Sequence, residues 1–487
     1  MDFQSLAGSR IPSVDDVTAE MNRAWDTYNG KLKDPLLTRP GQPSDNVKFN
    51  GSSIIVDTGV AFLFGKGFAY TLREDAPDDG SRTPAETYLD KFWIANDKDE
   101  FIHKVAINGA VCGQSYIKIH LANPYPKLYE INPAQMTVVT AADDPQYVLQ
   151  YVIRWSGINN KGKPLDFRQV ISRQPGGDPT DDSQGQPVPQ NWKIIDQRAI
   201  TQTRWMHDDQ VRWQTIGEEV WNYEFPPIVA CQNLSKPSSY VGKPDLSQDV
   251  IHLIEAINRT LSNINKILRI HAHPKTWSRG LSEGQVKQLR INADEMINLP
   301  GDTATLQNLE MQSDLASSIS YYYSLRQALY ELSRVPEIAS GKIADLQYMS
   351  AMAMQILYGP LIEKTNAKRI TYGGLIAELH RRLLIIAGMP IDQDTHIVWP
   401  EVYPRDAQIE SMTAINLQLV GVSQDTLLEG MGFNPKKERE RRALDQKEAV
   451  AHAGNLAVAT TPQTTPKAGE VPRGKEVGAS GSGGGNG

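Results

Sequence analysis

Two Gly-Lys pairs have the residue types of a phosphate-binding loop. Such a loop needs another glycine, separated by four residues from a Gly-Lys-Ser/Thr triplet, so that the backbone can surround the phosphates. Gly341-Lys342 has Pro336 at the position of that first glycine, and Gly242-Lys243 has Pro237 there. Neither pair therefore predicts a nucleotide-binding site.

The other reactive side chains predict no catalytic, cofactor or metal site either. His271 and His273 would share one face of a strand, but no cysteine or carboxylate lies close to them in the sequence. The sequence contains no Gly-x-Ser-x-Gly, His-Glu-x-x-His or paired-cysteine motif. Cys112 and Cys231 lie far apart in apolar surroundings, which favours two buried thiols in a reducing compartment over a disulfide.

The longest regular pattern in the chain predicts a helix over residues 245–270. Its apolar residues recur at 4-3-4-3-4 spacing, which places them on one face of a helix. We expect Asp245 to cap the N-terminus and Arg269 to lie near the C-terminus, where a positive charge suits the helix dipole. The helix would be roughly 39 Å long. The residues of its apolar face are Val250, Ile254, Ile257, Leu261, Ile264 and Leu268.

A second helix of similar length is predicted over residues 313–333, after an insert at 271–312. The insert has signals for short strands and one short helix, and it is too small to be an independent domain. The two helices therefore predict an antiparallel hairpin with a small α/β tip. Tyr321, Tyr322 and Tyr323 could stack on bases, but one of them falls in the apolar face, so helix packing is preferred.

The second helix is expected to end at Val335-Pro336, because proline disfavours the α conformation in the residue before it. A loop should follow as far as Gln347. A third helix then begins near Tyr348, is kinked at Pro360 and continues to about residue 387.

Composition and charge describe the rest of the chain. The first 244 residues alternate helical and strand patterns and predict an α+β body with a mainly antiparallel sheet. The 487 residues are 40% hydrophobic and carry a formal net charge of −7, so the surface as a whole should not attract nucleic acid. No run has the length of a membrane span, and the first residues do not resemble a signal peptide, which predicts a soluble protein made inside the cell. The Gly/Ser-rich C-terminal stretch should be disordered.

Several stretches, in this order and spacing, resemble the portal proteins of tailed double-stranded-DNA bacteriophages. The resemblance covers about residues 45–435. One departure is Ala351, where the family pattern has glycine. The stretches are 55–68, Asn108-Gly109 before Ser115-Tyr116, 225–229, 245–261 with Asn258 inside, Val335-Pro336-Glu337 and 350–358.

The resemblance implies a fold divided into wing, stem, clip and crown around a DNA channel. An α/β wing would take up residues 1–244 and 349–400, and a two-helix stem residues 245–270 and 313–333. The clip would be 271–312, the tunnel loop 334–348, the helical crown 401–455 and the disordered tail 456–487. In the tunnel loop the resemblance and the local pattern assign DNA-facing positions to Val335, Pro336, Gly341, Lys342 and Gln347.

The resemblance also implies the function and the partners. The protein would form a homododecameric ring at one capsid vertex, with no enzymatic activity and no cofactor. DNA would enter through the ring during packaging and leave through it during ejection. The apolar face of the first stem helix is too long for one hairpin to hide, so we predict that it also joins neighbouring subunits.

The expected partners are the terminase large subunit, a head-tail adaptor, the major capsid and scaffolding proteins, and double-stranded DNA. Lys275, Arg279 and Lys287 in the clip are candidate docking residues for the motor and the adaptor. The protein would be assembled in the host cytoplasm and would reside in the virion. The alternatives are a capsid-associated protease or nuclease, which the missing motifs disfavour, and a helical scaffold or adaptor, which the large α+β body disfavours.

Overall fold

The structure is a computed structural model of the chain, and it falls into two compact units, Met1–Pro404 and Arg405–Gly487. The described residues are 14–38, 40–41, 44–72, 82–141, 144–158, 162, 164–173, 191–200, 211–272, 276–279, 305–308, 315–337, 351–390, 394–401, 407–430, 435 and 438–447. Helices and antiparallel sheets are mixed throughout the first unit, which confirms the predicted α+β class.

Four helices begin the first unit: α1 (Val14–Tyr28), α2 (Gly51–Phe64), α3 (Pro84–Ala95) and α4 (Lys98–Cys112). A capping box starts α3, because the Thr83 hydroxyl accepts from the Glu86 N–H while the Glu86 carboxylate accepts from the Thr83 N–H. Gly113, with φ at 84°, ends α4 and allows the chain to turn directly into a strand. α2 and α4 contact each other and contribute many of the buried core side chains.

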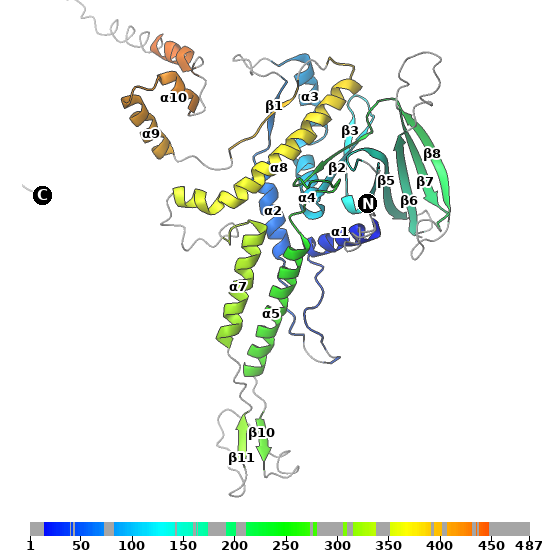
Figure 1. Cartoon of the computed structure of the whole chain (residues 1–487), viewed down its shortest axis with the longest axis vertical. Coiled ribbons are helices and arrows are strands. Elements are labelled where there is room, and N and C mark those ends of the chain that lie inside the picture. Colours follow the sequence, from blue (N-terminus) through cyan, green and yellow to red (C-terminus); the bar gives the residue numbers. More distant parts are fainter. Residues whose placement is uncertain are drawn as a thin grey trace, which may run out of the picture. The chain divides into compact units, whose positions relative to one another are not determined.

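Two antiparallel sheets follow. β2 (Gln114–His120) pairs with β3 (Lys127–Ile131) on one side and with β9 (Ile228–Gln232) on the other. The second sheet has the order β4-β5-β6-β7-β8. Its strands form a simple antiparallel meander (Figure 1), in agreement with the mainly antiparallel sheet predicted from the sequence, although β6 had not been predicted. The bounds are β4 (Met136–Thr140), β5 (Val148–Ile158), β6 (Pro164–Arg173), β7 (Trp192–Ala199) and β8 (Trp213–Trp221).

The predicted helical hairpin is formed by α5 (Gln248–Ala272) and α7 (Leu315–Ser333), which pack side by side (Figure 1). Between them in the sequence, β10 (Thr276–Arg279) and β11 (Thr305–Asn308) pair antiparallel. The short helix predicted at 282–289 and the strand predicted at 296–299 lie outside the described residues.

A third long helix, α8 (Ala351–Ile386), contains Pro360 and crosses the body against α2 and β9. β1 (Ala69–Thr71) and β12 (His396–Val398) form a small two-stranded sheet that contacts this helix. Tyr372, Ile376, Leu379 and Leu383 of α8 are fully buried, so this helix is part of the central core.

The second unit contains α9 (Ala407–Leu419) and α10 (Gln424–Gly430). The two helices contact each other. The Ser423 hydroxyl accepts from the Thr426 N–H and so caps the start of α10. A further helical stretch covers residues 438–447.

Candidate assembly and DNA-channel surfaces

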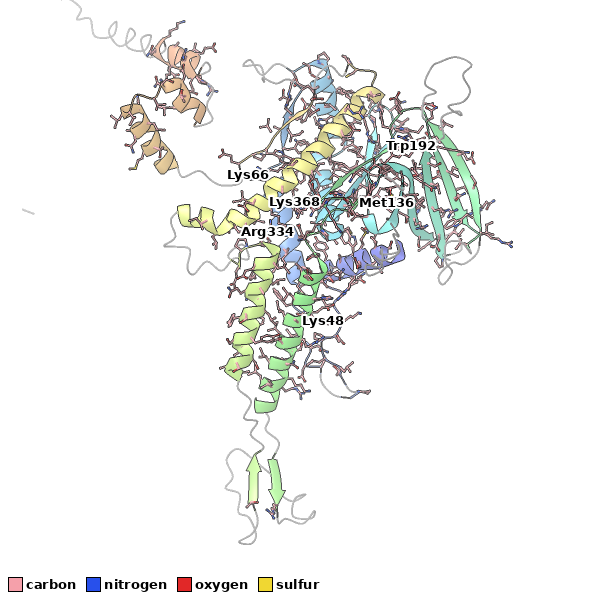
Figure 2. All side chains as sticks on the ribbon, viewed as in Figure 1. Lys48, Lys66, Met136, Trp192, Arg334 and Lys368 are labelled. Atoms are coloured by element: carbon pink, nitrogen blue, oxygen red, sulfur yellow. The ribbon has the colours of Figure 1, made fainter. Side chains whose placement is uncertain are left out.

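Asp245 lies at the junction between the hairpin and the body, and its carboxylate is completely buried. The Lys368 Nζ atom lies 2.5 Å from Oδ2, and the Lys364 Nζ atom lies 3.2 Å from Oδ1. The Asn233 amide donates to Oδ1 at 3.1 Å. Figure 2 labels Lys368 on α8 in this central region. We call Asp245, Lys364 and Lys368 the junction cluster.

The sequence prediction that Asp245 caps the first stem helix is wrong. The helix begins at Gln248, three positions later, and the carboxylate points to two lysines of α8 instead of the helix N-terminus. Burial alone would raise the pKa of Asp245, but the two ammonium groups outweigh it and lower this pKa to about 2. The carboxylate is therefore ionised at neutral pH and binds α8 to the residues just before α5.

The two lysines of this cluster have a sequence signal, although they belong to no motif. Lys364 and Lys368 continue the buried face of α8 that Leu361, Tyr372 and Leu375 define, at 3-4-4-3 spacing. A lysine at such a position must find a buried partner, because an unpaired buried charge is very unfavourable. The partner lies more than a hundred positions away in the chain, so sequence spacing could not identify it.

The Lys364 ammonium makes a second contact, with the end of α7. It donates to the Ser333 carbonyl oxygen at 3.0 Å. Carbonyls in the last turn of a helix lack partners within the helix, and a positive charge suits this end of the dipole. Arg334 then takes a left-handed backbone conformation, with φ at 59°, and Val335 enters the buried core. Figure 2 labels Arg334 at this end of the hairpin.

Close contacts with α2 and α4 surround Asp245 at the junction. A Cβ atom on Gly59 of α2 would lie 3.3 Å from Oδ2 of Asp245. The Asp245 N–H donates to the Ala110 carbonyl of α4 at 2.8 Å. Helices α2, α4, α7 and α8 thus all meet at the start of α5.

The predicted subunit-contact face of α5 divides into two parts. Val250, Ile254 and Ile257 are at most 1% exposed and pack within the chain's own core. Leu261 and Ile264 are partly exposed, and Leu268 is 47% exposed. The part of this face that is open to a neighbouring subunit therefore lies toward the C-terminal end of α5.

A polar stripe on another side of α5 was not predicted. Asn258, Ser262, Asn265 and Arg269 recur at 4-3-4 spacing and bind residues 45–49 of the same chain. The Ser262 hydroxyl accepts from the Val47 N–H at 2.9 Å, and Arg269 contacts both carboxylate oxygens of Asp45. This segment runs beside α5, where Figure 2 labels Lys48. Arg269 thus binds a specific partner in addition to its predicted place near the helix end.

The outer surface of α7 is rich in apolar and aromatic groups. Tyr321 and Tyr323 are 58% and 55% exposed, and Ile319 and Leu332 are 39% and 45% exposed. Tyr322 between them is half-buried and packs against the core, which confirms the packing interpretation for that one tyrosine. A cavity of about 430 Å³ lies between α7 and α8 and is lined by Tyr323, Arg326, Tyr330, Pro336, Leu357 and Pro360.

The structure describes only part of the predicted DNA-channel and clip residues. Val335 is buried and Pro336 is half-buried, whereas Gly341, Lys342 and Gln347 lie outside the described residues. Arg279 is exposed at the end of β10, and Lys275 and Lys287 also lie outside the described part. The buried position of Val335 places it against the chain's core.

Burial moves the pKa values of three side chains that can serve in catalysis, Cys112, Cys231 and His380, away from neutrality. Burial raises the pKa of the Cys112 thiol to about 12 and also raises the pKa of Cys231. Burial, together with the charge of Lys98, lowers the pKa of His380 to about 3. The Trp93 indole donates to Nε2 of this histidine at 2.8 Å. Within the described ranges, no cluster of three His, Cys, Asp or Glu side chains could hold a metal ion.

None of the helices in the described part of the chain is long and apolar enough to span a membrane. A family described as "Phage portal protein, SPP1 Gp6-like" matches residues 18–451. No curated protein matches the chain.

Two solved structures are similar at 12% sequence identity. One is titled "Virion of native gene transfer agent (GTA) particle", with a TM-score of 0.47, covering 85% of this chain and 94% of the other. The second is titled "Neck of empty GTA particle computed with C6 symmetry", with a TM-score of 0.46, covering 79% and 90%.

Proposed function

We infer the function from family membership: the chain belongs to the SPP1 Gp6-like phage portal proteins, because that family matches residues 18–451. It is a portal, the connector between head and tail. This match over nearly the whole chain is the observation that carries the conclusion. The expected resemblance to phage portals is confirmed.

We propose that twelve copies form a closed ring at one vertex of the capsid, with DNA passing through the centre. Residues 1–244 and 349–400 would form the wing and the α5–α7 hairpin the stem. The clip would be 271–312, the tunnel loop 334–348, the crown 401–455 and the disordered tail 456–487. The exposed apolar groups of α5 and α7 support a head-to-tail contact between neighbouring hairpins, because a monomer would leave them in water.

The channel function is supported by the charge of the chain. A net charge of −7 would let DNA slide through the ring with few strong phosphate contacts. Within the tunnel loop, Lys342 would add twelve weak positive charges around the bore, beside Pro336, Gly341 and Gln347. Lys342→Glu should permit ring assembly but alter the length or retention of packaged DNA, and unchanged filling, retention and release would remove this role.

We propose that the clip contacts the terminase large subunit before the head is full and a head-tail adaptor afterwards. The candidate contacts are Lys275, Arg279 and Lys287. Arg279 is exposed in β10, as docking requires. Replacing all three with Glu should leave rings intact and reduce packaging, whereas normal packaging would exclude these contacts. The wing and crown would face the capsid and scaffolding proteins inside the head, and the assembled protein would be part of the virion.

The proposed role is structural and needs no enzymatic activity or cofactor. A particle-forming system from which this chain is deleted should make heads without DNA, and the wild-type chain supplied in trans should restore filling. Heads that fill with DNA in the complete absence of the chain would contradict the portal role.

A further inference from the structure

Lys364 contacts the segment just before α5 and the end of α7 at the same time. Its Nζ atom binds Asp245, just before α5, and the carbonyl oxygen of Ser333, the last residue of α7. Lys364 itself belongs to α8 and is buried. One ammonium group therefore holds three elements together at the point where the hairpin leaves the body.

Lys368, one turn further along α8, provides a comparison within the same cluster. It binds the other oxygen of Asp245 at 2.5 Å and is as deeply buried as Lys364. Its bonds in the described part of the chain tie α8 to the residues before α5, and none of them reaches α7. The two lysines thus share a carboxylate but differ in their contact with the second helix.

Asp245 does not need both lysines to balance its charge. One lysine is enough to neutralise the Asp245 carboxylate, and a second buried ammonium adds a desolvation cost. Burial lowers the pKa of Lys368, in agreement with an excess of positive charge in the cluster. The hydrogen bond from Lys364 to the Ser333 carbonyl is a favourable interaction that offsets part of this desolvation cost.

The hydrogen bond from Lys364 stabilises the backbone turn at the end of α7. The helix stops at Ser333, and Arg334 adopts a left-handed conformation that is strained for a residue with a side chain. The chain must then turn so that Val335 enters the core. A charge-assisted hydrogen bond to the last carbonyl holds this turn against the body.

We propose that Lys364 couples the hairpin to α8, so that α5, α7 and α8 move as one rigid body. Separating the end of α7 from α8 requires breaking a buried charge-assisted hydrogen bond and leaving the ammonium group with one partner fewer. A displacement applied to α8 is therefore transmitted to the hairpin. This coupling is a property of the single chain and does not depend on the ring proposed above.

The test compares Lys364→Met with its matched control, Lys368→Met, in the full-length protein. Each change leaves one lysine paired with Asp245, but only Lys364→Met removes the bond to Ser333. Amide hydrogen exchange over residues 331–337 should become about tenfold faster in Lys364→Met and stay at the wild-type rate in Lys368→Met. Equal rates in the two variants, whether fast or slow, would overturn the coupling.

A measurement on the wild-type protein covers the case in which a variant does not fold. Native-state hydrogen exchange in increasing denaturant gives the free energy of each local opening. The last turn of α7 and residues 361–372 of α8 should open together, with the same dependence on denaturant. An α7 end that opens at lower denaturant than α8 would contradict the proposal.

Discussion

The Nζ atom of Lys368 lies 2.5 Å from Oδ2 of Asp245, although the two residues are 123 positions apart in the chain. Both side chains are buried, and the ion pair joins α8 of the body to the residues just before α5. A pair of this kind is sensitive to the loss of one partner, because the remaining charge is left in a medium that solvates it poorly.

Asp245→Asn should lower the free energy of unfolding by about 3–5 kcal/mol, because it leaves two buried ammonium groups without a counter-charge. Urea unfolding of the purified protein measures this difference. Asp249→Asn is the matched control, since Asp249 is an exposed acid in the first turn of α5. A loss of stability no larger in Asp245→Asn than in the control would show that the junction cluster is not structural.

Acid should destabilise the wild-type protein through His380. Its pKa is about 3 in the folded chain and near 6.5 when unfolded, so the unfolded state binds more protons between these values. The contribution of His380 to stability is therefore complete above pH 6.5 and is lost as the pH falls toward 3. It amounts to as much as about 5 kcal/mol for a shift of this size.

His380→Gln should remove that pH dependence, because glutamine does not titrate and its side-chain oxygen can still accept from Trp93. Denaturant unfolding at several pH values between 3 and 7 gives the slope. A variant whose stability falls as steeply as the wild type over this range would exclude His380 as the source. Asp245, with a pKa of about 2, adds a separate loss of stability below about pH 4.

The amphipathic pattern of α5 predicted the helix but not the partners of each face. The 4-3-4 recurrence of apolar residues located the helix within three residues of its observed ends. The same residues gave no indication that Ile257 packs inside the chain while Leu268 is exposed, because local spacing does not record which other element covers a face.

Sequence spacing also could not identify the partners of the polar side chains. Asp245 looked like a helix cap because it follows a proline and precedes an apolar pattern. Its actual partners, Lys364 and Lys368, are brought to it by the path of α8 through the core. Likewise, Ser262 and Arg269 bind residues 45–49, which lie more than 200 positions earlier in the chain.

A charge introduced into the apolar face of α5 should have different effects in the two halves of the helix. Ile257→Asp should destabilise the monomer itself, because Ile257 is completely buried within the chain. Leu268→Asp should leave the fold unchanged and weaken the contact between subunits. Asn263→Asp, at an exposed position of the same helix, is the control for adding a charge to α5.

Circular dichroism reports the fold of each variant, and sedimentation velocity reports the assembly. Rings of Leu268→Asp that are as stable as those of Asn263→Asp would exclude the C-terminal end of α5 from the subunit interface.

The mass of the purified particle tests the ring directly. Native mass spectrometry of the full-length protein should give about 650 kDa, which is twelve times the 54.1 kDa of one chain. Images along the particle axis should show a closed ring with a central hole. A particle that remains monomeric or dimeric at micromolar concentration would contradict the proposed assembly of the portal.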